Sequence, residues 1–161
     1  MRAPELTEPD RILRYGDHAD QYIEAWSPGG ASRGTVVLIH GGYWRAQFTA
    51  ALMRPLVPAF LARGWTVANV EYRRGADGWD ATSEDLGAAL ASARSGVPDV
   101  PLAIIGHSVG GQLALLGARG DDAVVALAPV TDLLRGYHEG IGGAAVAEFI
   151  PGSPDANPDV Y

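Results

Sequence analysis

The sequence predicts an α/β fold with a mostly parallel central sheet, and two observations support this prediction. Short, wholly apolar runs alternate along the chain with segments whose apolar residues recur at helical spacing. The apolar runs are rich in β-branched residues, which is typical of strands covered on both faces. Alternating strands and helices favour right-handed crossovers, so helices are expected on both faces of the sheet.

Composition predicts a single globular domain over residues 1–161. The chain has 47% apolar residues, a net charge of −7 and no cysteine, which excludes disulfides and thiol nucleophiles. All 12 basic residues are arginine, so no lysine can form a Schiff base, and 19 acidic residues make nucleic acid an unfavourable partner. The four histidines show no metal-ligand spacing, so no metal is expected. Without a signal peptide or membrane-spanning run, a cytoplasmic location without membrane association is expected.

The first half of the chain predicts three strands and a helix. Strands are expected at 12–15 and 21–26, around a turn, and at 35–39. After them a stripe of apolar residues recurs every four positions and predicts a core-facing helix ending near Gly64. The stripe consists of Phe48, Leu52, Leu56 and Phe60. Pro55 and Pro58 are expected to kink or shorten this helix.

The second half continues the alternation. Strands are expected at 65–70, 102–105 and 123–130, with helices after Thr82 and after Gly111. Thr82 and Asp85 match a capping box, which predicts the start of the first of these helices. The acidic residues around this start are expected to form a solvated face: Asp77, Asp80, Glu84 and Asp85. From Asp132 onward, glycines and prolines predict a turn-rich tail.

A candidate nucleophile lies in the stretch Gly106-His107-Ser108-Val109-Gly110, which fits G-x-S-x-G. Its context is an apolar strand before it and a helical pattern after it, and this is the context in which the motif marks a nucleophile on a sharp turn. Glycines on either side of Ser108 suit the strained backbone that such a turn requires. The neighbouring His107 is predicted to be a packed structural histidine, because a base is recognised by geometry and not by adjacency.

A second motif, His40-Gly41-Gly42-Tyr43-Trp44, follows the strand expected at 35–39. Glycines let a backbone approach a substrate closely, so the amides of Gly42 and Tyr43, with that of Val109, are candidates for an oxyanion hole. The alternative is that the two glycines only form a turn. His40 is expected to brace the loop, and Trp44 either lines a substrate pocket or packs in the core.

Together these motifs resemble the α/β-hydrolase superfamily, in the esterase branch that includes kynurenine formamidase (arylformamidase). Glu71-Tyr72-Arg73 and Thr131-Asp132-Leu133 are also similar to that branch. The resemblance implies an α/β-hydrolase fold and a serine hydrolase of carboxylic esters or an aryl formamide. It implies a small ester or amide substrate and no cofactor. It also implies two further strands carrying an acid and a histidine, which are missing here, so the domain is expected to be incomplete.

Three interpretations of this missing part remain open. The chain is a fragment, or a degenerate hydrolase that acts silently by binding or assembly, or Asp132 and His138 form a compact triad with Ser108. In each case the strand at 123–130 is expected to be an open sheet edge. The sequence therefore predicts a homodimer or a completing chain at that edge, and little activity of the chain alone.

Overall fold

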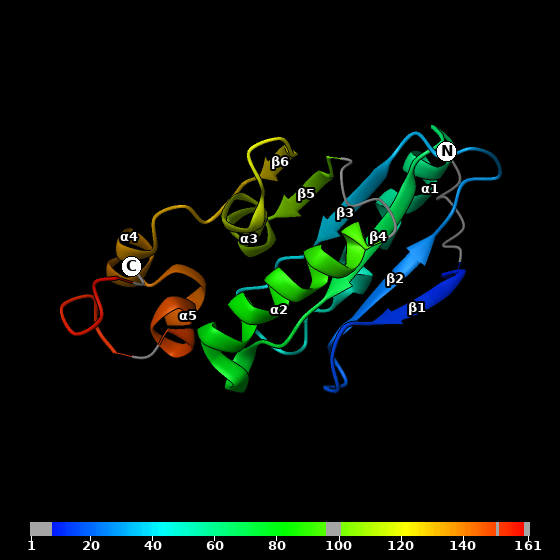
Figure 1. Ribbon diagram of the computed structural model, residues 1–161. Coiled ribbons are helices and arrows are strands. Elements are labelled where there is room, and N and C mark those ends of the chain that lie inside the picture. The colour runs from blue at the N-terminus through cyan, green and yellow to red at the C-terminus, as the bar shows by residue number, and fades with distance from the viewer. Residues whose placement is uncertain (1–7, 96–100, 151, 160–161) are drawn as a thin grey trace.

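The computed structural model describes residues 8–95, 101–150 and 152–159. They form a six-stranded sheet in the order β1-β2-β4-β3-β5-β6, with helices packed around it (Figure 1). The four strands from β4 to β6 pair in parallel, and β1 and β2 are antiparallel additions at one edge. This is the mostly parallel sheet that the alternating sequence pattern predicts.

All six expected strands are confirmed, with bounds that differ by at most a few residues. The third strand is formed by the residues expected for it, and the others are shifted or shortened at their ends. The bounds are β1 Arg11–Arg14, β2 Tyr22–Trp26, β3 Thr35–Ile39, β4 Thr66–Glu71, β5 Ala103–His107 and β6 Ala123–Leu127. Because β3 and β5 are central and parallel, their carboxyl ends bring the two candidate motifs to the same edge of the sheet.

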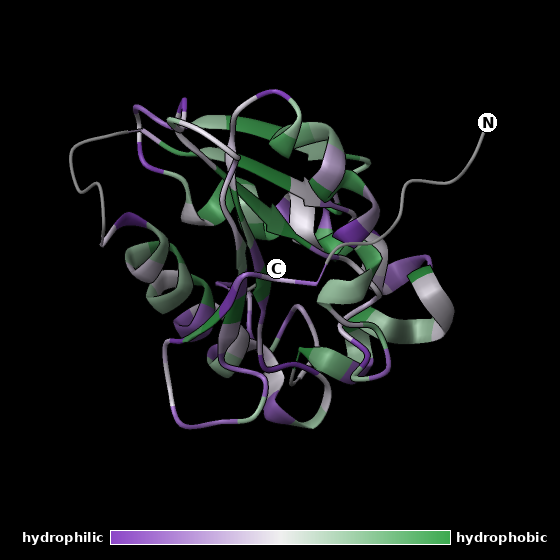
Figure 2. Ribbon diagram, turned by 90° about the vertical axis from the view of Figure 1, so that its right-hand side faces the viewer, coloured by the Kyte–Doolittle hydropathy of each residue, from purple (hydrophilic) through white to green (hydrophobic). Residues whose placement is uncertain are grey.

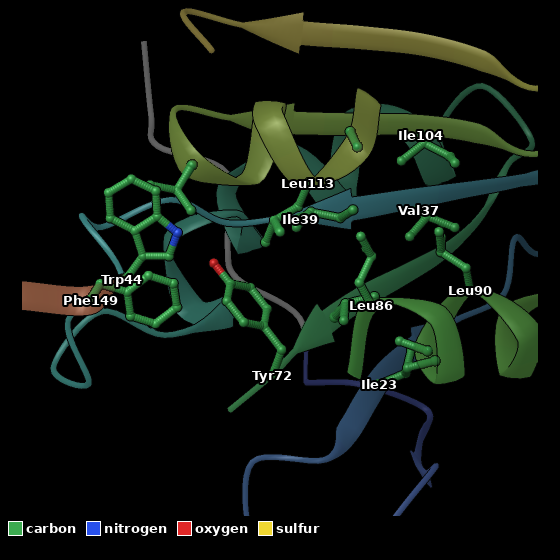
Figure 3. Packing of buried hydrophobic residues seen from close by; sticks show 14 of the residues in the cluster. Ile23, Val37, Ile39, Trp44, Tyr72, Leu86, Leu90, Ile104, Leu113 and Phe149 are labelled. Atoms are coloured by element: carbon green, nitrogen blue, oxygen red, sulfur yellow. The ribbon is translucent and has the colours of Figure 1, made fainter. Parts of the chain in front are cut away.

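The core is divided between the two faces of the sheet, because neighbouring residues of a strand point to opposite faces. Val37 and Ile39 of β3 face α2 (Gly78–Arg94) and α3 (Val109–Gly117), as Figure 3 shows for Leu86, Leu90 and Leu113. Val36 and Leu38 pack on the opposite face with Met53 and Val57. The central strand β3 is accordingly apolar at every position after Thr35, and the darkest green ribbons in Figure 2 are strands.

The helix expected from Phe48 to Gly64 is interrupted and shortened at Pro55 and Pro58, as expected, but the apolar stripe predicted to face the core is wrong. The segment contains two 3-10 turns, η1 (Ala50–Leu52) and η2 (Arg54–Leu56), before the short helix α1 (Val57–Leu61). Each proline removes an amide donor, and each lies near the start of a new helical piece, where that donor is not needed. The change of helical period turns Leu52 and Leu56 outward and buries Ala50, Met53 and Val57 instead.

The capping box at Thr82 is also a wrong prediction. Helix α2 begins at Gly78, after the 3-10 turn η3 (Gly75–Asp77), and the Thr82 hydroxyl donates to the carbonyl of Arg73 at 2.6 Å. Asp85 does not belong to a solvated face. Asp85 is buried and accepts a hydrogen bond from the Arg73 guanidinium. This positive partner stabilises a carboxylate on the buried face of α2.

The tail forms two short helices where turns are expected. Helices α4 (Leu133–His138) and α5 (Ile141–Phe149) lie beyond the carboxyl ends of the parallel strands (Figure 1). The glycine signal is still visible, since Gly142, Gly143 and Ala144 have left-handed backbone angles inside α5. Val146 and Phe149 are buried and hold this segment on the core.

Strand β6 is an edge strand with one sheet neighbour, β5, as the sequence predicts. Its side chains are more exposed than its apolar composition suggests, with Val125 48% and Leu127 42% accessible. Leu115 and Leu116 of α3 are exposed as well. No helix in the described ranges is both long enough and apolar enough to cross a bilayer.

Asp122, just before β6, gives a first testable prediction. Burial opposes its ionisation, but bonds from Arg94 and from the amides of Arg119 and Leu102 outweigh burial and lower the pKa of Asp122 to about 2. Since the pKa falls on folding, the stabilisation is present above about pH 4 and is lost as the pH drops through the folded value. Asp122→Asn should therefore cost about 2 kcal/mol of unfolding free energy at neutral pH.

Urea unfolding at several pH values measures this effect, and the gap between the two proteins should shrink steadily below about pH 4. The exposed neighbour provides the control, because Asp121→Asn should change little at any pH. A neutral-pH stability of Asp122→Asn equal to that of the unchanged protein would contradict the ion-pair account.

Candidate active site

Ser108 lies on the sharp turn between β5 and α3, as the motif predicts. Its backbone angles are φ 56° and ψ −120°, a sparsely populated conformation for a residue with a side chain. The turn is held by the Ser108 amide, which donates to Leu127 at 2.8 Å, and by the Ser108 carbonyl, which accepts from Gly111. Strain of this kind persists only where surrounding contacts fix it.

The glycine-rich loop after β3 lies directly against this turn. A Cβ atom at Gly41 would be 2.8 Å from the Ser108 Cβ, so only a glycine permits this approach. Ser108, Gly42 and Tyr43 line one cleft of about 460 Å³. The cleft is completed by Phe48, Leu52, His107, Ala128 and Val130. The structure therefore brings the hydroxyl and the loop together at one opening.

Backbone donors near Ser108 are left without partners. Within the described residues, nothing accepts a hydrogen bond from the amides of Gly42, Tyr43 or Val109. The Val109 amide opens helix α3, where the first amides have no intrahelical acceptor and the helix dipole is positive. Unpaired amides beside a hydroxyl are the arrangement that can accept a developing negative charge on oxygen.

Of two aromatic side chains near the site, His107 differs from expectation and Trp44 follows one of its two alternatives, core packing. His107 is exposed and lines the Ser108 cleft, so its prediction as a packed histidine is wrong; as the last residue of β5, its side chain projects from the sheet edge. Trp44 is buried and stacks on Phe149, with ring centroids 5.2 Å apart. Trp44 also lines a separate cavity of about 190 Å³ that includes Tyr43 and Arg45, and it does not line the Ser108 cleft.

Asp132 and His138 make other contacts than the triad with Ser108 that one interpretation predicts. The Asp132 carboxylate caps α4 by accepting from the Arg135 amide at 2.8 Å, and the exposed His138 lies at the other end of that helix. Across the described ranges, no hydrogen bond joins either residue to Ser108 or to the other. The same part of the chain contains no cluster of acidic or histidine side chains able to hold a metal ion.

A buried charged cluster under the loop is the main feature that the sequence interpretation does not foresee. Glu71, the last residue of β4, accepts from His40 at 2.9 Å, from Arg74 at 2.6 Å and from the Ala50 amide at 2.9 Å. His40, Glu71 and Arg74 are all at least 95% buried. The signal in the sequence is Glu71 at the end of a strand, followed after one residue by two arginines.

The negative charge of the Glu71 carboxylate is stabilised by several groups. Burial alone would raise the pKa of Glu71, but the hydrogen bond and charge of His40, the Ala50 amide and Arg74 together lower it below its ordinary value. Glu71 therefore remains ionised inside the protein. An ionised carboxylate with this many donors fixes the three segments that contact it, which are the loop after β3, the start of η1 and the end of β4.

Comparison with solved structures identifies the fold. A protein proposed to be a thioesterase from Silicibacter sp. TM1040 superimposes with a TM-score of 0.74 at 25% identity, over 90% of this chain and 57% of its own. Esterase B from Lactobacillus rhamnosis gives a TM-score of 0.71 at 21% identity, over 97% and 61%. Esterase 2 from Thermogutta terrifontis gives 0.67 at 20%, over 97% and 67%.

The chain thus spans less than two-thirds of the first two of these proteins. Its six-stranded, mostly parallel sheet is that of an α/β-hydrolase, as the motifs predict. No curated protein matches the sequence. Residues 26–125, well over half of the chain, match the BD-FAE family, and they include β3, the glycine-rich loop, the Ser108 turn and most of the sheet. The chain belongs to the BD-FAE family.

Proposed function

We propose that this chain provides the nucleophile and the oxyanion hole of a serine hydrolase acting on carboxylic esters. The Ser108 oxygen attacks the ester carbonyl, and the amides of Gly42, Tyr43 and Val109 bind the resulting oxyanion. Collapse of the tetrahedral intermediate expels the alcohol and leaves an acyl group on Ser108. Water then attacks the acyl-enzyme, releases the carboxylic acid and restores the hydroxyl.

The observation that supports this proposal is the strained Ser108 turn, which shares one cleft with Gly42 and Tyr43, while the amides of Gly42, Tyr43 and Val109 have no acceptor among the described residues. The similarity to a proposed thioesterase at 25% identity supports acyl chemistry on this fold. An aryl formamide is a second substrate class, because its carbonyl passes through the same kind of tetrahedral intermediate. The cleft of about 460 Å³ is large enough for a small acyl group with its leaving group.

We further propose that the triad acid and histidine come from outside these 161 residues. Supporting this, Asp132 is used as a helix cap and His138 lies at the far end of α4. The exposed edge of β6 is the surface at which a further segment or a second chain would join the sheet. A chain without its base should react with strong electrophiles and turn over esters slowly.

A fluorophosphonate probe tests the proposal, because it is a strong electrophile that can phosphonylate the serine without needing turnover. Esterase 2 of Thermogutta terrifontis is described as phosphonylated by sarin, a reagent of the same class. We expect mass spectrometry to find the adduct on Ser108, and Ser108→Ala to lose all of it. Ser95→Ala, which changes an exposed serine at the end of α2, is the control and should keep the adduct.

The result that opposes the proposal is equally clear. A folded chain in which Ser108 stays unmodified at high probe concentration would favour a catalytically silent α/β-hydrolase domain that acts by binding. Size-exclusion chromatography at micromolar concentration then tests whether the chain associates through the exposed edge of β6. A stable monomer that unfolds cooperatively would contradict this association.

A further inference from the structure

The ring of His40 contacts an acceptor at each nitrogen. Nε2 lies 2.9 Å from the Glu71 carboxylate, and Nδ1 lies 2.8 Å from the carbonyl oxygen of Gly41. The ring is completely buried, so no water can replace either partner. It also stacks on Tyr72, with centroids 4.5 Å apart. Each of these two contacts therefore needs a proton that comes either from the His40 ring or from its partner in the protein.

The carboxylate cannot supply the proton between Glu71 and Nε2. The Glu71 oxygen that faces His40 also accepts from Arg74 at 2.6 Å and from the Tyr72 amide at 3.1 Å. The other oxygen accepts from the Ala50 amide. Both oxygens are thus acceptors, and the proton shared with Nε2 belongs to His40. A backbone carbonyl has no proton to give, so Nδ1 must donate as well.

Holding the Gly41 carbonyl also fixes the next amide. The Gly41 carbonyl and the Gly42 amide belong to one planar trans peptide, in which the oxygen and the hydrogen point in opposite directions. When Nδ1 holds the oxygen, the Gly42 hydrogen points away from the His40 ring. A positive ring also draws electron density from this peptide, which strengthens its amide as a donor.

We propose that His40 is a positioning residue that carries both ring protons and aims the Gly42 amide at the oxygen bound in the Ser108 cleft. The role in catalysis rests on the proposed function, whereas the protonation state does not. Tyr72 supports the same loop one residue earlier, since its hydroxyl donates to the His40 carbonyl at 2.8 Å. His40 contacts no reacting atom and acts only through the Gly42 peptide.

The charges around the ring are compatible with a buried imidazolium. Glu71 and Tyr72 face it from the end of β4, and Arg74 shares the Glu71 oxygen. Asp20 lies 3.8 Å from the Arg74 guanidinium and provides a second carboxylate. The Glu71 carboxylate thus contacts both His40 and Arg74 inside the protein, and the partly exposed Asp20 lies beside Arg74 at the edge of the cluster, so each positive group has a carboxylate nearby.

Nuclear magnetic resonance of the full chain with ¹⁵N-labelled histidine measures the protonation directly. His40 is assigned by through-bond correlation to its own backbone, so the measurement needs no variant. We expect both His40 nitrogens to carry protons at about pH 8, where a histidine ring in water is neutral. A ring with one unprotonated nitrogen at that pH would overturn the proposal.

Two variants test whether the second proton of His40 depends on the charge of Glu71 and not on that of any buried acid. Glu71→Gln removes the negative charge beside Nε2, so His40 should lose one ring proton at the same pH. Asp122→Asn neutralises another buried, arginine-paired acid that has no contact with the ring, and His40 should keep both protons. Loss of the proton in both variants, or in neither, would contradict the assignment to Glu71. If Glu71→Gln does not fold, the measurement on the unmodified chain still tests whether His40 carries both ring protons.

The positioning role has its own readout in the kinetics of probe labelling. His40→Gln should lower the maximal rate of Ser108 phosphonylation by about tenfold to a hundredfold, while the probe concentration at half-maximal rate stays the same. Asp122→Asn should leave both quantities unchanged. An unchanged maximal rate in His40→Gln overturns the positioning role. If the unmodified chain is not labelled at all, the proposed function fails, and the ring measurement still stands on its own.

Discussion

Replacing Gly110 with alanine is expected to destabilise the protein by about 3 kcal/mol. The added Cβ would lie 2.1 Å from the carbonyl oxygen of Ile39 and 2.5 Å from that of His40. Both atoms are backbone, so no side-chain rotation relieves the clash and β3 must move away from α3. The same movement would separate the glycine-rich loop from Ser108, so probe labelling should fall together with stability.

The matched control is Gly87→Ala, in the interior of α2. Nothing lies within 4 Å of a Cβ at Gly87, and alanine is the better helix former by about 0.5–1 kcal/mol. Chemical unfolding should therefore show a lower unfolding free energy for Gly110→Ala and a higher one for Gly87→Ala, although both replace glycine with alanine. A loss below about 1 kcal/mol for Gly110→Ala would mean that α3 does not begin against the end of β3.

Replacing Trp44 with alanine should cost about 3–5 kcal/mol, because the indole is buried and its neighbours cannot fill the space. The indole stacks on Phe149 of α5, and Phe149 in turn meets Trp79 of α2 edge-on at 6.3 Å (Figure 3 shows the first pair). This aromatic group joins α5 to the rest of the core. Its loss should loosen the α4–α5 segment first.

Limited trypsin digestion checks this order of events. Trypsin cuts this lysine-free chain only after arginine, and Arg135 is the last arginine and lies in α4. Cleavage at Arg135 should become faster in Trp44→Ala than the change in global stability explains. Trp65→Ala, a partly buried tryptophan outside this aromatic group, should neither open that site nor cost as much. Slow cleavage at Arg135 in Trp44→Ala would contradict the proposed role of the stack.

The strands were predictable because their signal is local. Thr35–Ile39 is apolar at every position after the threonine and β-branched at most, so burial on both faces follows from the sequence itself. The Ser108 turn was predictable for the same reason, since two glycines flank the serine between a strand and a helix. Periodicity failed between Phe48 and Gly64, where prolines restart the helix and change which residues face the core.

Contacts between residues far apart in the sequence could not be predicted from the local sequence pattern. Asp85 was predicted to be solvated because it lies among acids, yet Arg73 lies across from it and makes its burial possible. Trp44 was left between a substrate pocket and the core, and only the packing of Phe149, far along the chain, shows that it is a core residue. The same holds for Asp132 and His138, because only the structure shows that they lie at opposite ends of helix α4.

The sequence by itself determined the six strands in their order along the chain, the serine on its turn and the glycines that allow close approach, because each depends on neighbours within a few residues. Only the tertiary structure decided that Glu71, Arg74 and His40 form one buried cluster under the glycine-rich loop. Charged groups can be buried there because partners from separate segments neutralise one another, and no local pattern records which partners the folded chain will provide.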